Sequence, residues 1–542
     1  MSRGFVSVLG GAPEVPFSQA VLNGWAPDGG MYWPAAVEPV SQATLASWAG
    51  LSYPRLCEEV LKRFIAADDP DISRVELASI TSAAFEAFGA TEIVKLRPLS
   101  TGSESKEALH VLELWHGPTL AFKDLGMSVL GRTLHHLLRK RRQRTTLLVG
   151  TSGDTGSSAM EAVRGLDGIE IVVLYPLQGF SSISPVQEMQ MTAVAQAAPN
   201  VHLIGVEGSS DDLDRPMERC FRDADFKGRH QLGSVNSVNV VRLLVQTVHY
   251  FYAYCRLARP DAPDAPDAAP EVQFAVPCGA AGHLAAGVLA MQMGLPMRLI
   301  AGTNSNDALH ALLRTGTLQP GRPVVQTASP SMDIQVPYNV WRILYVASGG
   351  DAAAVGRWQA DFAAGRLELP GRVRAWLDAR IRSAAVDDGA TARTMRGAHA
   401  HGSYLLDPHT AVGVAAALAA PATAAATATP TATAAPPSVV VCFACAHPVK
   451  FLPTVEAAFG CGTERALAMA REGSVGHRCV EAVARMATDA REGYPSPGWV
   501  PPGCCAVLRK RPGASADQWE AEWTAALRAK IEDLTSGRRS KL

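Results

Sequence analysis

The chain of 542 residues contains no uninterrupted apolar run of about 18 residues or more, which argues against a membrane-spanning helix. It also has no excess of charge of either sign, because 50 Lys and Arg residues face 51 Asp and Glu residues. A near-neutral chain without a long basic patch excludes binding to nucleic acid through bulk charge. With 47% apolar and 19% charged residues, the composition is that of a large globular protein with several packed units.

The cysteines also lack a pattern. Ten of them are scattered along the chain without the spacing of a disulfide scaffold, which is typical of reduced, intracellular proteins. Cys442 and Cys445 form a single Cys-x-x-Cys pair with no second pair or histidines at suitable spacing, so no metal site is expected. The first residues lack the charged-then-apolar layout of a secretory signal.

The chain ends in Ser540-Lys541-Leu542, the tripeptide that peroxisomal import receptors read at a C-terminus. A match of three residues also arises by chance. We therefore expect an intracellular protein, cytoplasmic or peroxisomal, with an import receptor as a candidate partner.

Two segments have compositions that predict disordered surface loops. Residues 259–270 repeat Pro, Asp and Ala, and residues 415–437 are almost entirely Ala, Thr and Pro. Neither segment has large apolar side chains whose burial would offset the entropy of ordering. The first hundred residues are expected to be mostly helical, since apolar residues from Leu56 to Phe64 recur at helical spacing after Ser52.

The middle of the chain alternates apolar runs, glycine-containing loops and amphipathic segments. Strands are expected at 146–149, 169–174, 273–276 and 438–443, and helices at 158–163 and from about 284 to 293. This alternation predicts a largely parallel sheet with helices on both faces. Ligands of such sheets bind at the loops that follow the carboxyl ends of the strands.

One of these loops has the composition of an anion-binding site. Gly279, Ala280, Ala281 and Gly282 precede His283 and a helix, so small side chains would leave backbone N–H groups open to a phosphate. A tight turn that packs helix on sheet explains this loop equally well.

A second loop, formed by Thr151, Ser152, Gly153, Asp154 and Thr155, has the same design with added hydroxyl groups. It suits a carboxylate or phosphate at a helix N-terminus. The alternative is an N-cap, in which the Ser and Asp side chains of the loop only satisfy the first helical amides.

Lys123 follows an apolar stretch and precedes an amphipathic helix. A lysine in such a place usually extends its amine to water. If the side chain is buried, its pKa falls and the neutral amine can form a Schiff base. The pattern alone leaves both readings open.

Residues 115–124 (WHGPTLAFKD) resemble the pyridoxal-phosphate lysine motif of the threonine synthase family, and residues 151–156 (TSGDTG) resemble that family's substrate loop. The matches keep the family's order from about residue 2 to 456. Six further segments take part: 26–30 (APDGG), 187–192 (QEMQMT), 234–239 (SVNSVN), 331–334 (SMDI), 407–412 (DPHTAV) and 446–448 (AHP).

The resemblance implies an α/β protein of PLP-dependent fold type II (tryptophan synthase β-like), with parallel sheets flanked by helices and a mostly helical N-terminal region. It implies a threonine synthase N-terminal region over 1–95, a catalytic region of two subdomains over 96–456, and a C-terminal region over 457–542. A homodimer is a further expectation.

The resemblance also implies pyridoxal 5'-phosphate as the cofactor, joined to Lys123, with the loop 279–283 around its phosphate. Cys445 would face the pyridine nitrogen, and Asp154 would lie near the 3′ oxygen. The loop 151–155 would hold the carboxylate of a small phosphorylated amino acid. The substrate phosphate needs cations, and Arg242 is the main candidate, with a surface ion pair as its alternative role.

Ser184 and Lys450 are further candidates for the substrate phosphate. Two departures bear on the reaction. The segment 279–282 (GAAG) resembles the threonine synthase-like 2 subgroup rather than biosynthetic enzymes, and Cys445 stands where the family usually has threonine. A thiol is a weaker hydrogen-bond donor than a hydroxyl. Against the subgroup, Pro118 and the His447-Pro448 pair keep the synthase form.

Three functions therefore remain. The favoured one is a carbon–oxygen lyase that releases phosphate from O-phosphohomoserine or O-phosphothreonine, giving 2-oxobutyrate and ammonia. The second is a threonine synthase that converts O-phosphohomoserine and water to threonine. The third is a degenerate cofactor-binding protein with an interaction role, against which the retained Lys123 argues.

Overall fold

The computed structural model describes residues 4–539 except 89, 91, 103–107, 152, 178, 181–182, 209, 259–271, 420–438, 473–476, 494–502 and 512. The N-terminal region is mostly helical, as expected. Strands β1 (Phe5–Ser7) and β2 (Tyr32–Pro34) pair antiparallel. The region also contains the helices α1 (Phe17–Asn23), α2 (Gln42–Trp48), α3 (Tyr53–Leu61) and α4 (Arg74–Phe85). A capping box of Ser73 and Glu76 fixes the start of α4.

The larger sheet is six-stranded. Its strand order is β13 (Ile381–Ala385), β10 (Met297–Thr303), β9 (Val272–Pro277), β14 (Val439–Ala444), β4 (Ala108–Glu113) and β3 (Lys95–Pro98). All neighbours pair parallel except β3 with β4. The strands predicted at 273–276 and 438–443 are confirmed as β9 and β14.

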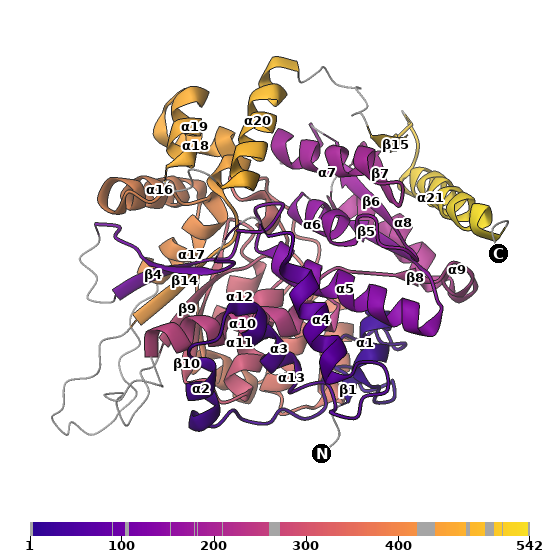
Figure 1. Cartoon of the computed structure of the whole chain (residues 1–542), viewed down its shortest axis with the longest axis horizontal. Coiled ribbons are helices and arrows are strands. Elements are labelled where there is room, and N and C mark those ends of the chain that lie inside the picture. The colour runs from indigo at the N-terminus through magenta and orange to yellow at the C-terminus, as the bar shows by residue number, and fades with distance from the viewer. Residues whose placement is uncertain are drawn as a thin grey trace.

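The smaller sheet is five-stranded and parallel throughout. Its order is β15 (Cys504–Leu508), β7 (Val201–Val206), β6 (Ile169–Pro176), β5 (Thr145–Gly150) and β8 (Leu232–Gly233). Helices α6 (Asp154–Val163) and α7 (Pro185–Ala197) pack beside it. Figure 1 shows the two sheets as separate layers with helices around each. Two sheets that are parallel except for β3, flanked by helices, confirm the predicted α/β fold class.

Two long helices link the sheets. α5 (Lys123–Arg141) carries a buried face of leucines and Met127, and α10 (Val240–Ala258) is buried along most of its length. α10 packs on α5 and on α11 (Gly282–Gln292), so it fixes Lys123 and the glycine loop relative to each other. The other helices and short strands are α8 (Ser210–Arg222), α9 (Ala224–His230), α12 (Ala308–Thr315), β11 (Thr317–Leu318), η1 (Pro330–Met332), α13 (Val340–Ala347), α14 (Ala352–Ala363), β12 (Leu367–Glu368), α15 (Gly371–Asp378), α16 (Asp388–Gly402), η2 (Pro448–Phe451), α18 (Leu452–Phe459), α19 (Thr463–Arg471) and α20 (Arg478–Gly493).

The prediction of a disordered loop over residues 415–437 is wrong for its first residues. Helix α17 (Pro408–Ala419) continues through this stretch, and Ala415, Ala416 and Ala417 are buried. A Cβ built on Gly302 in β10 would lie 3.0 Å from the Cβ of Ala416, so small residues on both elements permit a close approach. The rest of that segment, and all of 259–270, lie outside the described residues.

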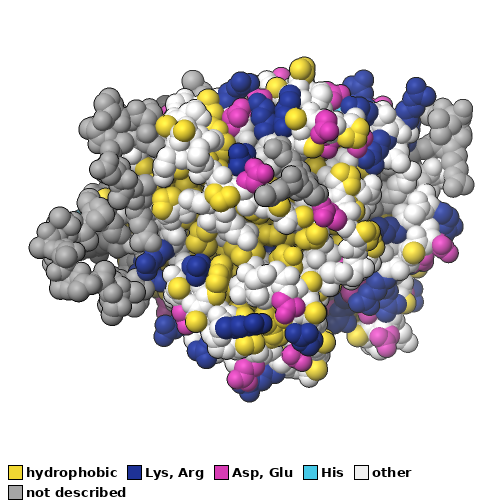
Figure 2. Space-filling model, turned by 90° about the horizontal axis from the view of Figure 1, so that it is seen from below, with side chains coloured by type: hydrophobic (Ala, Val, Ile, Leu, Met, Phe, Trp, Pro, Cys, Tyr) yellow, Lys and Arg dark blue, Asp and Glu magenta, His cyan; other side chains and the backbone are white. Residues whose placement is uncertain are grey.

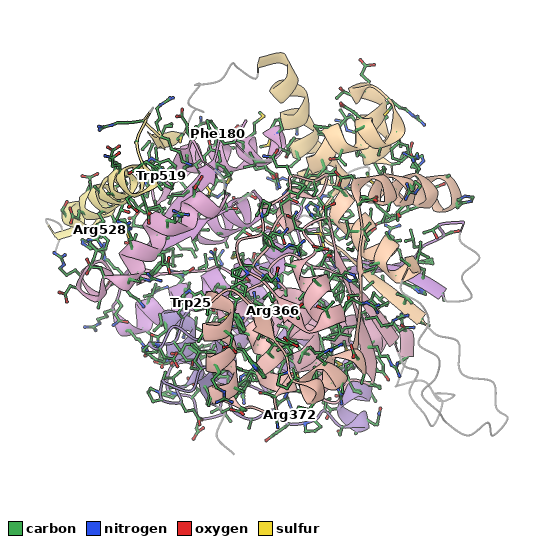
Figure 3. All side chains as sticks on the ribbon, turned by 180° about the vertical axis from the view of Figure 1, so that it is seen from behind. Trp25, Phe180, Arg366, Arg372, Trp519 and Arg528 are labelled. Atoms are coloured by element: carbon green, nitrogen blue, oxygen red, sulfur yellow. The ribbon has the colours of Figure 1, made fainter. Side chains whose placement is uncertain are left out.

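The C-terminal region joins the smaller sheet. β15 is its edge strand, and α21 (Ala516–Arg539) packs on α8. Figure 3 shows Trp519 and Arg528 on this helix, and Arg528 forms an ion pair of 2.9 Å with Asp223. The predicted boundary at residue 456 falls inside α18, and the tripeptide 540–542 lies outside the described residues.

The surface agrees with the near-zero net charge. Figure 2 shows basic and acidic side chains interspersed on the face that it presents, without a broad field of one sign. Of the helices in the described ranges, none combines the length and the apolarity that crossing a bilayer requires.

Candidate active site

A cavity of about 560 Å³ lies where loops leave the carboxyl ends of strands from both sheets. The volume is within the usual range for small-molecule and cofactor sites. It brings together most of the residues predicted from sequence, namely Lys123, Thr151, Asp154, Thr155, Arg242, Gly279, Ala280, Ala281, Gly282, His283 and Cys445. A second cavity, of about 80 Å³ between Arg97 and Thr410, is too small for a cofactor.

Lys123 is the first residue of α5 and points into the cavity. Its Nζ lies 3.5 Å from Oδ2 of Asp154 and 4.9 Å from the centre of the Phe122 ring. Burial lowers the pKa of Lys123, and the Asp154 carboxylate offsets only part of that effect. The reading in which this lysine extends to water is therefore excluded, and a reactive neutral amine is favoured.

Backbone bonds hold the Lys123 segment against the end of β14. The N–H of Phe122 donates to the Cys445 carbonyl at 2.7 Å, and the N–H of His447 donates to the Leu120 carbonyl at 3.1 Å. These bonds join the segment predicted to carry the cofactor to the residue predicted to face its ring.

Asp154 opens α6 and is almost completely buried. Its Oδ1 accepts from Gln187 Nε2 at 2.8 Å and lies 2.8 Å from Lys450 Nζ. Its Oδ2 accepts from the Ser331 hydroxyl at 3.2 Å. Burial alone would raise the pKa of Asp154, but the ammonium groups of Lys450 and Lys123 hold that pKa far below its usual range. The carboxylate is therefore ionised.

The loop before α6 is organised by Thr151. Its Oγ1 accepts from the N–H of Gly153 at 3.0 Å and from the N–H of Gly156, in the first turn of α6, at 2.8 Å. Thr151 thus satisfies an amide of the first turn, whereas the Asp154 carboxylate, proposed as a cap, is bonded to other side chains. Gly153 has φ 137°, and a Cβ there would lie 2.6 Å from the Gln187 side chain, so only glycine fits. Thr155 lines the cavity, and Ser152 lies outside the described residues.

The loop after β9 forms the amino terminus of α11. Ala281 adopts a left-handed conformation (φ 61°), and the first N–H groups of α11 have no acceptor within the helix. A Cβ on Gly279 would lie 3.1 Å from Met332 Cα and from Ile334 Cδ1, so a larger residue there would require these neighbours to shift. The loop thus offers backbone donors to an anion in the cavity.

Cys445 lies on the cavity wall with its backbone fixed. Its N–H donates to Thr410 Oγ1 at 2.9 Å, and Thr410 in turn donates to Asp407. Burial raises the pKa of the Cys445 thiol well above its usual value. The thiol is therefore neutral, and it donates to the Phe443 carbonyl at 3.7 Å.

Arg242 and Arg342 are both buried, but their guanidinium groups differ in how many hydrogen bonds they make. Arg342 donates to three backbone carbonyls and to Asn339. Arg242 is 2% exposed and lines the cavity. Within the described residues it donates to the Val235 carbonyl at 3.5 Å, and its Nε has no partner among them. Burial lowers the pKa of Arg242 to about 10, which still leaves it charged at neutral pH. The surface ion pair weighed for Arg242 is wrong.

The other two phosphate candidates lie away from the cavity wall. The Ser184 hydroxyl caps α7 and donates to the Lys450 carbonyl at 2.9 Å, and the Lys450 side chain is 0% exposed. Sequence reasoning gave no role to Ser331 and His409, which do line the cavity. His409 accepts from the Ser331 N–H at 3.1 Å and contacts Asp407 at 2.9 Å. Both residues lie in segments that carry the family resemblance, 331–334 and 407–412, and this position could have identified them as site residues.

Comparisons with known proteins agree with this geometry. Residues 4–85 match the family model "Threonine synthase N terminus", and residues 84–372 match "Pyridoxal-phosphate dependent enzyme". The chain is 39% identical to human threonine synthase-like 2 over 76% of this chain and 82% of that protein. It is 36% identical to threonine synthase of Pseudomonas aeruginosa over 85% of this chain and 92% of that protein.

Solved structures extend the likeness. PLP-bound threonine synthase from Brucella melitensis is 34% identical, with a TM-score of 0.73 over 89% of this chain and 99% of that one. Threonine synthase from yeast is 27% identical, with a TM-score of 0.79 over 100% of this chain and 99% of that one.

The residues present fit pyridoxal phosphate. The cavity has room for it, Lys123 offers an amine of lowered pKa, and the α11 terminus offers donors for a phosphate. Together with the two family matches, these observations show that the chain belongs to the threonine synthase family of pyridoxal-phosphate-dependent enzymes.

Proposed function

We propose that the protein is a carbon–oxygen lyase that removes phosphate from O-phosphothreonine or O-phosphohomoserine and releases 2-oxobutyrate and ammonia. The observation that carries this proposal is the buried guanidinium of Arg242 on the cavity wall, without a carboxylate partner among the described residues. Leaving such a charge uncompensated costs several kcal/mol. A phosphate on the substrate would satisfy it, and guanidinium binds phosphate through paired hydrogen bonds.

The remaining roles follow from position in the cavity. When bound, pyridoxal phosphate supplies an electron-withdrawing ring that acidifies the Cα–H bond of an attached amino acid. Lys123 would hold the cofactor aldehyde, yield it to the substrate amine and then take the Cα proton with its freed Nζ. The glycine loop from Gly279 to His283 would hold the cofactor phosphate.

The loop 151–155 would orient the substrate carboxylate, and the neutral Cys445 thiol would face the pyridine nitrogen. A neutral partner there leaves the ring a weaker electron sink, which suits reactions in which a leaving group takes the electrons. Phosphate is such a group: it departs with the electrons of the broken C–O bond. One water then hydrolyses the unsaturated amine product to keto acid and ammonia.

Threonine synthase activity is the second candidate, favoured by the extent of the likeness to threonine synthases. With O-phosphohomoserine, whose phosphate is on Cγ, both reactions require removal of a proton from Cα and then from Cβ before phosphate leaves. The synthase then adds water at Cβ, whereas the lyase releases the unsaturated amine, which is hydrolysed to the keto acid and ammonia. The two functions differ in where one water is held.

The experiment is to incubate the purified holoenzyme with each phosphorylated amino acid and to follow phosphate, threonine and 2-oxobutyrate. Keto acid and ammonia without threonine would support the lyase. Threonine from O-phosphohomoserine would replace the lyase by the synthase. If the cofactor is bound and neither substrate releases phosphate, both proposals fail and the non-catalytic role is restored.

A further inference from the structure

Behind the cavity lies a second buried lysine that the proposed reaction does not use. The Nζ of Lys450 donates to the Thr119 carbonyl at 2.7 Å and lies 2.8 Å from Oδ1 of Asp154. The side chain is 0% exposed. To reach a substrate phosphate it would have to abandon both contacts, so the role considered for it from sequence does not fit.

The two oxygens of Asp154 face different partners. Oδ1 faces Lys450 and the amide of Gln187, which lie on the side away from the cavity. Oδ2 faces Lys123 and the hydroxyl of Ser331, both of which line the cavity. Asp154 thus separates the two ammonium groups, one structural and one on the cavity wall.

This arrangement matters because Lys123 must lose its charge to act as a nucleophile or a base. If Lys123 were the sole cation beside Asp154, its deprotonation would leave a buried carboxylate without a counterion. Lys450 supplies that counterion independently of Lys123. The charged or titratable groups that face Lys123 are Asp154, Cys445, Arg242 and Lys450, and burial lowers its pKa further.

We propose that Lys450 is a positioning residue that keeps Asp154 ionised and turned toward the cavity, and that favours the neutral form of the Lys123 amine. The inference rests on the proposed role of Lys123. It assigns no contact with substrate or cofactor to Lys450: the side chain acts by pairing with Asp154 and, through space, by the repulsion between its ammonium group and that of Lys123. Besides Asp154, the groups close to Lys450 are Asp124 and His447, and besides the two lysines Asp154 faces His409.

The test is the pH dependence of Lys123 labelling in the full-length chain after removal of the cofactor. A trace of acetic anhydride is applied across a pH series, and acetylation of Lys123 is followed by mass spectrometry. In Lys450→Met the midpoint should rise by roughly 1 to 3 pH units, since Asp154 would pair with Lys123 alone. The matched control is Gln190→Met, which removes an uncharged donor 3.2 Å from the same Thr119 carbonyl and should leave the midpoint unchanged. Equal midpoints in the two variants would overturn the inference.

A second pair of variants covers the case in which Lys450→Met does not fold. Asp154→Asn lowers the Lys123 midpoint, and adding Lys450→Met to it should raise the midpoint again because a nearby cation is removed. If the double variant titrates at the same pH as Asp154→Asn, the inference fails. Borohydride reduction of the wild-type holoenzyme and peptide mapping show separately whether Lys123 carries the cofactor, so failure of the proposed function is distinguishable.

Discussion

Nδ1 of His249 in α10 lies 3.0 Å from Nε2 of His283, the last residue of the glycine loop. The His283 ring is stacked between Phe122 and Phe443 at 5.5 and 4.3 Å between ring centres. Burial lowers the pKa of His283 to about 3, and burial and the neighbouring ring lower that of His249 well below its usual value. Both rings are therefore neutral, and one N–H joins them.

This pair predicts a loss of stability in acid. In the unfolded chain each histidine is protonated below about pH 6.5, whereas in the folded chain both rings stay neutral until a much lower pH. The contribution of the pair is thus constant above about pH 6.5 and falls as the pH drops toward about 3 for His283. Urea unfolding at about pH 7.5 and about pH 5 measures it. His249→Asn, which keeps a polar atom near Nδ1, should lose less stability between these pH values, and an equal loss would contradict the prediction.

Lys123→Ala should abolish covalent attachment of the cofactor while the chain stays folded. The buried amine is removed together with one partner of Asp154, and Lys450 still compensates that carboxylate. The measurement is the absorbance of the bound cofactor, followed by borohydride reduction and mass spectrometry. Lys140→Ala provides the control because Lys140 lies on the same helix, is partly exposed and pairs with Glu76. Cofactor still fixed to the chain in Lys123→Ala would refute the assignment of Lys123.

Sequence patterns were sufficient to predict those parts of the fold in which neighbouring elements follow one another directly along the chain. Strand β9, the glycine loop and α11 follow one another within about twenty residues, so their sequence places Gly279 and His283 at a carboxyl strand end. The place of Lys123 before the apolar face of α5 left its role open, and only the resemblance of residues 115–124 to the family's lysine motif assigned it to the cofactor. Residues that line one cavity could thus be selected before their distances were known.

Contacts between distant segments were not predictable. Lys450 meets Asp154 across nearly three hundred residues, and nothing in its own segment indicates a fully buried side chain. The Ala-rich end of α17 was predicted as a loop because alanine offers little apolar area, but the close approach of β10 at Gly302 makes small residues the ones that fit. Burial of this kind is set by the partner and not by composition.

Cys445→Thr should strengthen cofactor binding. A hydroxyl is a better donor than a thiol, and one hydrogen bond contributes about 0.5–1.5 kcal/mol, or roughly 2- to 10-fold in Kd. Equilibrium dialysis of pyridoxal phosphate measures the change. Cys442→Val, which lies in β14 three residues before Cys445 and is absent from the cavity wall, should leave Kd unaltered. An unchanged or weaker Kd in Cys445→Thr would show that the side chain at 445 does not donate to the cofactor ring.

Arg242→Leu should impair phosphorylated substrates and spare the cofactor. The guanidinium is buried on the cavity wall, and its Nε has no partner in the described part of the chain, so its removal costs the protein little while a bound phosphate loses its cation. Removing one partner of a buried charge pair costs about 2–5 kcal/mol, which predicts a fall in kcat/KM of at least about 30-fold. Arg242→Lys should recover part of this loss, since it restores the charge without the paired donors. Arg256→Lys, on the same helix but bonded to the Ala49 and Leu51 carbonyls, is the control. A parallel rise in the Kd for pyridoxal phosphate would instead place Arg242 at the cofactor phosphate. Cofactor binding is measured without substrate, so a side chain that contacts only the substrate phosphate would not change it.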